Sequence, residues 1–356
     1  MKKLRLFSCL FATLAVIGCL TACTSKPNET SEKISVADML GETIEINKNP
    51  KKVACVSRTT YDLLIAFGLG DYIDGAYKTI YDNPWVPEIH SGASREYRYE
   101  YEESYETFIS RGVDLVFAPE KYISDGLKEH GVNALCVSLY GNPTFENYVY
   151  YMADLTKQLW DDPTVQAKAD AWKNKVSKAI SDVTTELAKH EIEEKTIYYV
   201  RGDKNKGIGY TDTKSSFTSY AYNALGFKFA SDNFETNKPS AEAICEANPD
   251  VIVIGGIYQN TLVNTLTTTE PYKNLDVVKN NKFYTIPVGF TMFEQIGIMT
   301  PVFFYDMANK IYPEYFNYDV EKMVKDTIKE YFDYDLTDSQ VTNMLQGKNS
   351  NGENLA

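Results

Sequence analysis

The sequence predicts an α/β protein made of two halves that are joined by one long helix. Short apolar runs of strand length alternate with helical patterns, which favours parallel strands covered by helices. The alternation ends near residue 160 and begins again after Lys195. Between these points, residues 162–191 carry one unbroken helical pattern. Periodicity alone would also allow one helix of a single large domain, but the renewed alternation favours a connector between two lobes.

The first residues have the pattern of an export signal. Three basic residues precede an apolar run that is short for a membrane span, and the run ends in Leu20-Thr21-Ala22-Cys23. This tetrapeptide resembles the lipobox of bacterial lipoproteins, in which the signal is cut before a cysteine that then carries lipid. We therefore expect a lipoprotein signal peptide over 1–22, lipidation at Cys23 and a polar tether over 23–33. An uncleaved anchor helix is the alternative.

The net charge of the chain limits the kinds of binding partner that we expect. The formal net charge is −13, and removal of residues 1–22 would make it more negative because they carry only basic charges. This balance argues against binding to nucleic acid and against direct adhesion to anionic lipid.

Three cysteines, Cys55, Cys136 and Cys245, lie in or beside apolar runs of the folded part. Their odd number and their surroundings predict buried reduced thiols.

The N-terminal half, residues 34–161, begins with a hairpin and continues with strands and helices in turn. Residues 34–46 alternate in polarity around Leu40-Gly41, which predicts the hairpin. Proline, glycine and a run rich in tyrosine and arginine predict a loop over 80–102. Strands are expected at 51–56, 71–76, 114–118 and 134–139, and helices at 60–69, 104–111, 123–130 and 144–160.

The connector, residues 162–191, has a clear start signal. Asp162 is a good N-cap, and Pro163 suits the first helical position. Apolar residues then recur at spacings of three and four, which predicts one buried stripe. At ~1.5 Å per residue the helix would span about 40 Å. The stripe consists of Val165, Ala169, Trp172, Val176, Ala179, Val183 and Leu187.

The C-terminal half, residues 192–315, repeats the pattern of the first. Strands are expected at 196–200, 227–230, 251–254 and 283–287, and helices at 215–225, 240–247 and 301–311. A glycine-containing loop is expected over 201–213. Residues 316–356 form an extension, for which helices at 320–332 and 336–345 and a disordered polar tail are predicted.

Several stretches along the chain carry a family likeness: Lys51-Lys52-Val53-Ala54-Cys55-Val56-Ser57, Gly112-Val113-Asp114-Leu115-Val116-Phe117-Ala118, Ala247-Asn248-Pro249-Asp250-Val251-Ile252-Val253-Ile254-Gly255-Gly256 and Asn280-Asn281-Lys282-Phe283-Tyr284-Thr285-Ile286-Pro287. In this order they resemble the solute-binding lipoproteins of ABC importers, most closely the branch for iron–siderophore complexes, haem and cobalamin. The resemblance implies an α/β fold of two Rossmann-like lobes with mainly parallel sheets, joined by one long helix, with a ligand cleft between the lobes. It also implies a monomer that delivers its ligand to a permease dimer with ATPase subunits.

The same resemblance implies a pair of docking residues. Related proteins place a glutamate on the exposed top of each lobe, where arginines of the permease dock. Glu106 lies eight residues before Asp114, and Glu242 lies eight residues before Asp250. Identical offsets in the two halves fit a pseudo-symmetric pair, although two ordinary exposed glutamates would look the same.

Ligand-binding candidates follow from the position of loops after strands, since ligands of open α/β sheets bind beyond the carboxyl ends of the strands. Arg58 follows the first strand at a helix N-terminus, where a cation opposes the helix dipole unless an anion is near. The alternatives are a solvated arginine or one paired with Asp62. The resemblance adds the stretch before Glu106. The full set of candidates is Arg58, Arg95, Arg98, Tyr99, Lys121, Tyr122, Tyr140, Arg201, Tyr210, Tyr258, Phe290 and Phe293.

These residue types favour a polyanionic chelate. Guanidinium groups bind carboxylate or catecholate oxygens in bidentate fashion, and tyrosines offer flat apolar faces with a polar tip. We therefore expect capture of an iron(III)–siderophore or similar metal chelate, with haem or a cobamide as the alternative ligand. A surface lipoprotein for signalling or adhesion is the alternative from another class.

No catalytic group can be assembled from the sequence. The three histidines, His90, His130 and His190, are scattered, and no nucleophile motif surrounds them. The same scatter argues against direct binding of a metal ion by the protein. We expect neither an enzyme nor a resident cofactor, but a binding protein on the extracytoplasmic face of the cell membrane.

Overall fold

The computed structural model describes residues 32–138, 145–213 and 216–356. Cys23 and the predicted signal peptide lie outside these residues. Lys33–Ala356 form one compact unit, which contains a two-stranded, a five-stranded and a four-stranded sheet. Within the described part of the chain, no helix has the length and apolar character needed to cross a membrane.

The N-terminal half holds the predicted hairpin and a parallel sheet of order β5-β4-β3-β6-β7. The hairpin pairs β1 (Lys33–Ala37) with β2 (Thr43–Asn47) in antiparallel register. The sheet strands are β3 (Val53–Cys55), β4 (Ile73–Tyr77), β5 (Tyr97–Tyr99), β6 (Leu115–Ala118) and β7 (Ala134–Cys136). The helices are α1 (Arg58–Ala66), α2 (Trp85–Ile89), α3 (Tyr105–Arg111), α4 (Lys121–Glu129), α5 (Phe145–Val149) and α6 (Tyr151–Leu159).

Two predictions for this half were wrong. Residues 80–102 are not only loop, because they contain α2 and the edge strand β5. Both elements are short and lie in a stretch rich in proline, glycine and charge, which obscures a periodic signal. The predicted helix 144–160 is two helices, and Tyr150 separates α5 from α6.

The C-terminal half holds a second parallel sheet, of order β11-β10-β8-β9. Its strands are β8 (Thr196–Val200), β9 (Lys228–Phe229), β10 (Val251–Ile254) and β11 (Phe283–Thr285). Its helices are α8 (Phe217–Ala224), α9 (Ala241–Ala247), α10 (Gln259–Thr268), α11 (Asp276–Lys279) and α12 (Thr300–Ile311). Sequence reasoning missed α10, because its many threonines and asparagines have low helix propensity; Leu262 and Leu266 hold it by packing into the core.

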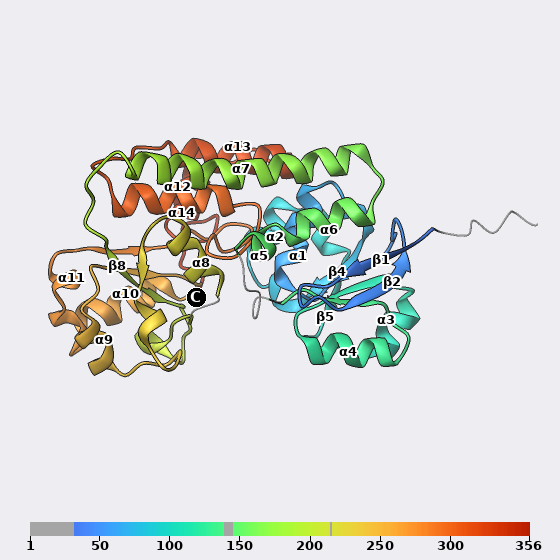
Figure 1. The fold of residues 1–356 in the computed structure, drawn as a ribbon, viewed down its shortest axis with the longest axis horizontal. Helices are drawn as coiled ribbons and strands as arrows, with labels where there is room; N and C mark the ends of the chain where they lie inside the picture. Colours follow the sequence, from blue (N-terminus) through green and yellow to red (C-terminus); the bar gives the residue numbers. More distant parts are fainter. Residues whose placement is uncertain (1–31, 139–144, 214–215) are drawn as a thin grey trace, which may run out of the picture. The chain divides into compact units, whose positions relative to one another are not determined.

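The connector is confirmed as one long helix, α7 (Pro163–Leu187), which ends four residues earlier than predicted. The Asp162 carboxylate caps it by accepting from the Thr164 N–H at 2.7 Å. Six of the seven predicted stripe residues are buried, and Leu187 is half-buried. α7 packs against α6 of the first half and α12 of the second. Figure 1 shows α7 extending alongside both sheets, so the predicted fold class is confirmed.

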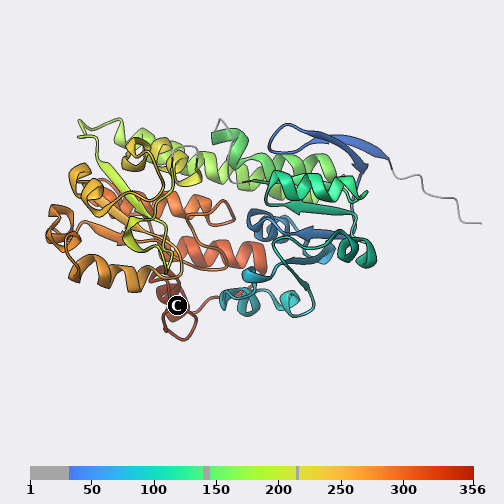
Figure 2. The same ribbon diagram turned by 90° about the horizontal axis from the view of Figure 1, so that it is seen from below.

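The extension after α12 contains the two predicted helices, α13 (Val320–Phe332) and α14 (Asp338–Leu345). α13 contacts both α12 and α1. The prediction of a disordered tail was wrong. Residues 346–356 form a compact turn, in which Lys348 and Asn354 make an antiparallel bridge and the Asn349 N–H donates to the Glu353 carbonyl at 2.8 Å. Figure 2 shows this last segment on the side away from α7.

One hydrophobic core runs through both halves of the protein. It includes one face of each parallel sheet, the buried stripe of α7 and the apolar faces of α12, α13 and α14. A smaller cluster covers the other face of each sheet. Because strand residues alternate between faces, Val53 and Cys55 face the shared core, whereas Ala54 and Val56 face the smaller cluster.

Candidate functional site

A cavity of about 460 Å³ lies at the carboxyl ends of both parallel sheets. Loops after β3, β4, β8, β10 and β11 contribute to its wall, which is the placement expected for a ligand site in open α/β sheets. One further wall residue comes from the last segment of the chain. The lining residues are Arg58, Tyr61, Thr79, Ile80, Asp82, Asn83, Pro84, Arg201, Gly202, Asp203, Tyr210, Gly256, Ile257, Tyr258, Phe290, Thr291, Met292, Gln295 and Leu355.

Arg58 supplies a cation from the first half. It is the first residue of α1, which is why its side chain lies at the carboxyl end of β3. Its guanidinium donates to the Thr79 hydroxyl and lies 5.3 Å from the centroid of the Tyr77 ring. Burial lowers the pKa of Arg58, and Tyr77 and Asp82 act in the opposite direction. The alternative pairing with Asp62 was wrong, because the Asp62 carboxylate accepts from other groups.

Arg201 supplies a cation from the second half. It follows β8, and its guanidinium forms an ion pair with the Asp212 carboxylate at 2.9 Å. The Tyr210 ring lies 5.3 Å from the same guanidinium. The adjacent loop requires glycine: a Cβ atom on Gly202, whose φ is +74°, would lie 1.8 Å from the Gly255 carbonyl oxygen. This close approach of the loops after β8 and β10 fixes the position of Arg201.

Aromatic side chains form the base of the cavity. The rings of Tyr61 and Phe290 stack at 5.8 Å with an interplanar angle of 9°. The Tyr61 hydroxyl donates to the Glu96 carboxylate at 2.6 Å, and Tyr81 donates to the same oxygen at 2.8 Å. His90 lies 2.9 Å from the other oxygen of Glu96. The stacked pair therefore rests on a hydrogen-bonded polar cluster that holds Tyr61 in one orientation.

Two buried carboxylic acids lie behind the cavity wall, and sequence reasoning missed both. Asp62 accepts from the Ile298 N–H at 2.9 Å and from the Thr291 hydroxyl at 3.2 Å, which links α1 to the loop after β11. Glu294 accepts from the Gly256 N–H at 2.6 Å, and its other oxygen has no partner among the described residues. Burial raises the pKa of each group to about 7. The signal for Asp62 was a lone acid within an apolar helix.

Five of the predicted ligand-binding residues meet at this cavity. They are Arg58, Arg201, Tyr210, Tyr258 and Phe290. The loop-after-strand argument selected all five, although their mutual distances were not predictable. Tyr140 lies outside the described residues, so its placement stays a prediction.

Three further candidates around the edge strand β5 do not line the cavity. Arg95 and Arg98 are exposed to solvent, and the Arg98 guanidinium lies 5.1 Å from the Tyr81 ring centroid. Tyr99 has no exposed surface, and its hydroxyl donates to Asp74. The reason is that this stretch is a strand, which directs Tyr99 into the cluster on the far face of the sheet.

The remaining candidates also face elsewhere. Lys121 lies on the surface beside Glu42 and Asp125, with which it forms ion pairs. Tyr122 is 58% exposed. Phe293 is fully buried in the shared core. These placements away from the cavity have one cause, since a position shortly after a strand does not fix the direction of the side chain.

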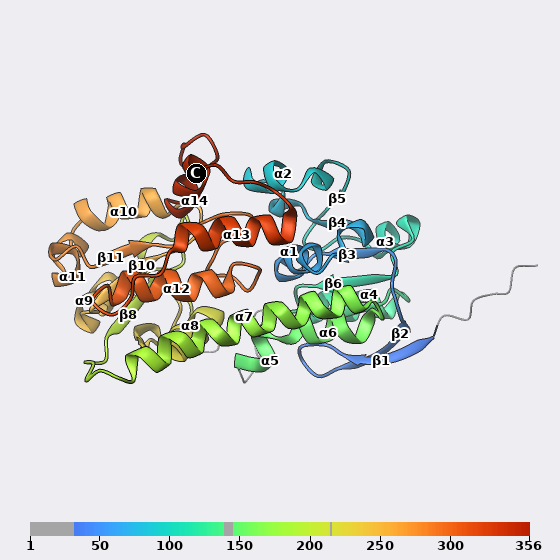
Figure 3. The same cartoon turned by 90° about the horizontal axis from the view of Figure 1, so that it is seen from above.

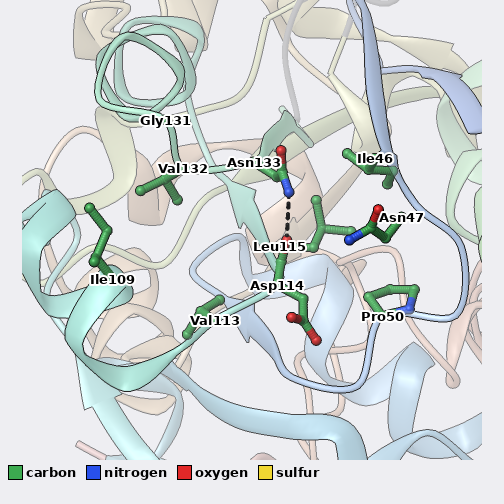
Figure 4. Close-up of a pocket in the computed structure, with 10 residues that line it drawn as sticks. All are labelled: Ile46, Asn47, Pro50, Ile109, Val113, Asp114, Leu115, Gly131, Val132 and Asn133. Carbon is green, nitrogen blue, oxygen red and sulfur yellow. Dashed lines mark hydrogen bonds between the residues drawn. The ribbon is translucent and has the colours of Figure 1, made fainter. Parts of the chain in front are cut away.

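A second pocket lies at the opposite edge of the first sheet (Figure 4). Its volume is about 160 Å³, and it lies where β6 and β7 begin. Asp114 accepts from the backbone N–H groups of Lys51 and Lys52 at 2.8 and 2.9 Å, and Asn133 donates to the Asp114 carbonyl at 3.1 Å. These polar groups tie strands together, so we assign the pocket a structural role.

The two predicted docking glutamates occupy equivalent places in the two halves. Glu106 is in the first turn of α3, and Glu242 is in the first turn of α9. Both helices have seven residues, follow a serine N-cap, and end at a residue in the left-handed conformation. Both glutamates are exposed, and each one's own backbone N–H lowers the pKa of its carboxyl. Because each helix runs back against its sheet, both glutamates lie near the cavity edge of the molecule.

Two parallel sheets with a cavity at their carboxyl ends have the arrangement found in the fold of two-lobed binding proteins. A family model described as a periplasmic binding protein matches residues 114–288. An uncharacterised ABC transporter substrate-binding lipoprotein of Bacillus subtilis, YvrC, is 21% identical over 319 residues, which cover 86% of this chain and 96% of that protein. Residues 114–288 thus match the periplasmic binding protein family, and the similarity to a substrate-binding lipoprotein extends over most of the chain.

One further relative and two solved structures are also similar to this chain. The Fe(3+)-citrate-binding protein YfmC of Bacillus subtilis is 31% identical over 122 residues, which cover 33% of this chain and 37% of that protein. The molybdate-bound periplasmic binding protein MolA of Haemophilus influenzae has a TM-score of 0.70 at 13% identity, and the match covers 85% of this chain and 99% of that one. Helicobacter pylori CeuE with Ni(II) bound has a TM-score of 0.69 at 17% identity, covering 88% and 99%. These structural likenesses show that this chain shares the fold of these two proteins.

Proposed function

We propose that the protein is the extracytoplasmic solute-binding component of an ABC importer and captures an iron(III) chelate, such as a siderophore or citrate complex. The observation that carries this proposal is a cation from each half at one cavity: Arg58 from the first and Arg201 from the second. Ligand binding would then connect the two lobes. We assign the lobes to residues 34–161 and 192–315, joined by the helix region 162–191.

The chemistry of the wall suits an anionic chelate with flat organic groups. Guanidinium groups bind carboxylate, hydroxamate or catecholate oxygens through paired N–H donors. Tyr210, Tyr258 and Phe290 offer ring faces beside these cations. The description of YfmC as an Fe(3+)-citrate-binding protein supports the same class of ligand.

A titration of the purified full-length protein tests the ligand class. The probes are ferric citrate, a ferric trihydroxamate and a ferric catecholate, with free Fe(III), haem and a cobamide as comparison arms, followed by calorimetry. We expect saturable binding of at least one ferric chelate at a stoichiometry of one. Tight binding of haem or the cobamide alone would favour the alternative ligand, and binding of none of these probes would refute importer capture of such ligands.

The same proposal assigns Glu106 and Glu242 to permease docking and Cys23 to lipid attachment. Anionic side chains at equivalent exposed positions suit a pseudo-symmetric contact with a permease dimer. We expect Glu106→Ala with Glu242→Ala to abolish cellular uptake of the bound chelate while its affinity in solution stays within twofold. The matched control replaces two other exposed glutamates, Glu129 and Glu246. Undiminished uptake by the double variant would contradict docking and favour a signalling or adhesion role.

A further inference from the structure

We propose that residues 346–356 form one wall of the ligand cavity and that Leu355 is a specificity-determining residue for the bound chelate. The proposal rests on the proposed function of the cavity. Leu355 is a wall residue of the same cavity as Arg58, Arg201 and Phe290, although it lies more than fifty residues beyond the last strand. We call residues 346–356 the wall segment.

The wall segment has a defined internal structure. The Asn349 N–H donates to the Glu353 carbonyl at 2.8 Å, and the Glu353 N–H donates back to the Asn349 side-chain oxygen at 2.9 Å. The Lys348 N–H donates to the Asn343 carbonyl at 2.9 Å, which fixes the segment to the end of α14. These bonds form a closed turn that reverses the chain direction. As a result, Leu355 returns toward the molecule instead of pointing into solvent.

Both halves of the protein hold the wall segment in place. The buried indole of Trp85, in α2 of the first half, donates to the Lys348 carbonyl at 2.8 Å. Asn260, in α10 of the second half, donates to the Asn354 side chain at 3.0 Å. Figure 3 shows the end of the chain between α2 and α10. The segment therefore bridges the two halves beside the cavity.

Leu355 gives this side of the cavity an apolar surface. The cations and hydroxyl groups of the cavity would bind the charged part of a ligand, whereas a leucine offers only van der Waals contact. A group added to or removed from an apolar contact changes binding by roughly 10- to 200-fold per methylene-sized step. A leucine at this place thus favours a chelate with an apolar group of matching size. It disfavours chelates that are bulkier or charged at this side.

Two variants of opposite size and one matched control test the specificity role. Leu355→Ala enlarges the cavity and Leu355→Trp reduces it, whereas Asn351→Ala changes an exposed side chain of the same segment. The probes are ferric citrate as the small chelate and a ferric trihydroxamate as the large one, titrated calorimetrically into the full chain. We expect the affinity ratio of large to small chelate to rise about tenfold in Leu355→Ala and to fall about tenfold in Leu355→Trp. A ratio within twofold of the wild type in both variants would overturn the proposal.

A second measurement needs no ligand. Hydrogen–deuterium exchange of the ligand-free protein should show slow exchange at the amides of Lys348, Asn349 and Glu353, because each has an acceptor. Exchange of these amides at the rate of an unfolded peptide would show that the wall segment is not formed. This result would overturn the proposal whichever ligand the protein binds. If the wild type binds no chelate, the proposed function fails and the specificity role of Leu355 fails with it. Slow exchange would in that case still support the wall as a structural feature.

Discussion

Replacement of Asp62 by asparagine should flatten the dependence of protein stability on pH. Burial raises the pKa of Asp62 from its ordinary 3.8 to about 7. The folded protein therefore binds more protons than the unfolded chain between these values, and stability falls as pH rises through this window. Full stability from this group is present below about pH 4 and is lost above about pH 7.

The magnitude follows from the same pKa values. Each unit of difference in pKa between folded and unfolded chains corresponds to ~1.4 kcal/mol, so ionisation of buried Asp62 costs about 4 kcal/mol above pH 7. An asparagine oxygen can still accept from the Ile298 N–H and the Thr291 hydroxyl, as the carboxylate does at 2.9 and 3.2 Å. Asp62→Asn thus removes the ionisation cost and keeps the link between α1 and the loop after β11.

Urea unfolding at intervals between pH 4.5 and 8.5 measures the effect. We expect the free energy of unfolding of Asp62→Asn, relative to the wild type, to increase by about 3–4 kcal/mol across this range. Subtracting the free energy of unfolding of the wild type from that of the variant cancels the contributions of all other titrating groups, including buried Glu294. Asp62→Ala serves as the comparison, since it lacks the ionisable group too but leaves the donors of Ile298, Thr291 and Leu63 without this partner. It should be less stable than Asp62→Asn by about 2–5 kcal/mol at every pH. Parallel curves for wild type and Asp62→Asn would refute the reasoning.

Three further predictions concern the cavity and the connector. Arg58→Gln should weaken binding of a ferric chelate by about tenfold or more in calorimetry, whereas Arg95→Gln, at an exposed position, should leave it within twofold. Gly202→Ala should lower the free energy of unfolding by about 3 kcal/mol or more, because its Cβ would lie 1.8 Å from the Gly255 carbonyl oxygen; an unchanged urea midpoint would contradict this. Saturating chelate should change the radius of gyration in solution scattering only slightly, since α7 is a stiff connector, and a large decrease would count against it.

The sequence predicted those parts of the fold that depend on local patterns. The buried stripe of α7 follows from spacing, and its start follows from Asp162 and Pro163, whose capping contacts are local. Strands with continuous apolar runs, such as β6 and β10, were recognisable because parallel strands are buried on both faces. α10 was missed because a long-range contact, the burial of Leu262 and Leu266, decides its structure.

The site was predictable only as far as topology determines it. Topology places Arg58, Arg201 and Tyr258 near the carboxyl ends of strands, and the structure brings them to one cavity. Topology does not show that Tyr99 points to the far face of the sheet, because a strand of three residues is hard to recognise from sequence. It also cannot show that Leu355 reaches the cavity, since that depends on a turn held by contacts with α2 and α10.

The position of the extension alters how ligand release is expected to work. α7 connects the two halves on one side of the molecule, and α13 with the wall segment connects them on another (Figure 3). Wide opening would have to break the Trp85 and Asn260 contacts, the stacking of Tyr61 on Phe290 and the bonds of Asp62 together. The free-energy cost of these contacts keeps the open form rare, whereas a permease that binds the open form more tightly would favour it through its differential affinity. If Glu106 and Glu242 dock the permease as proposed, release should depend on that contact more than on spontaneous opening.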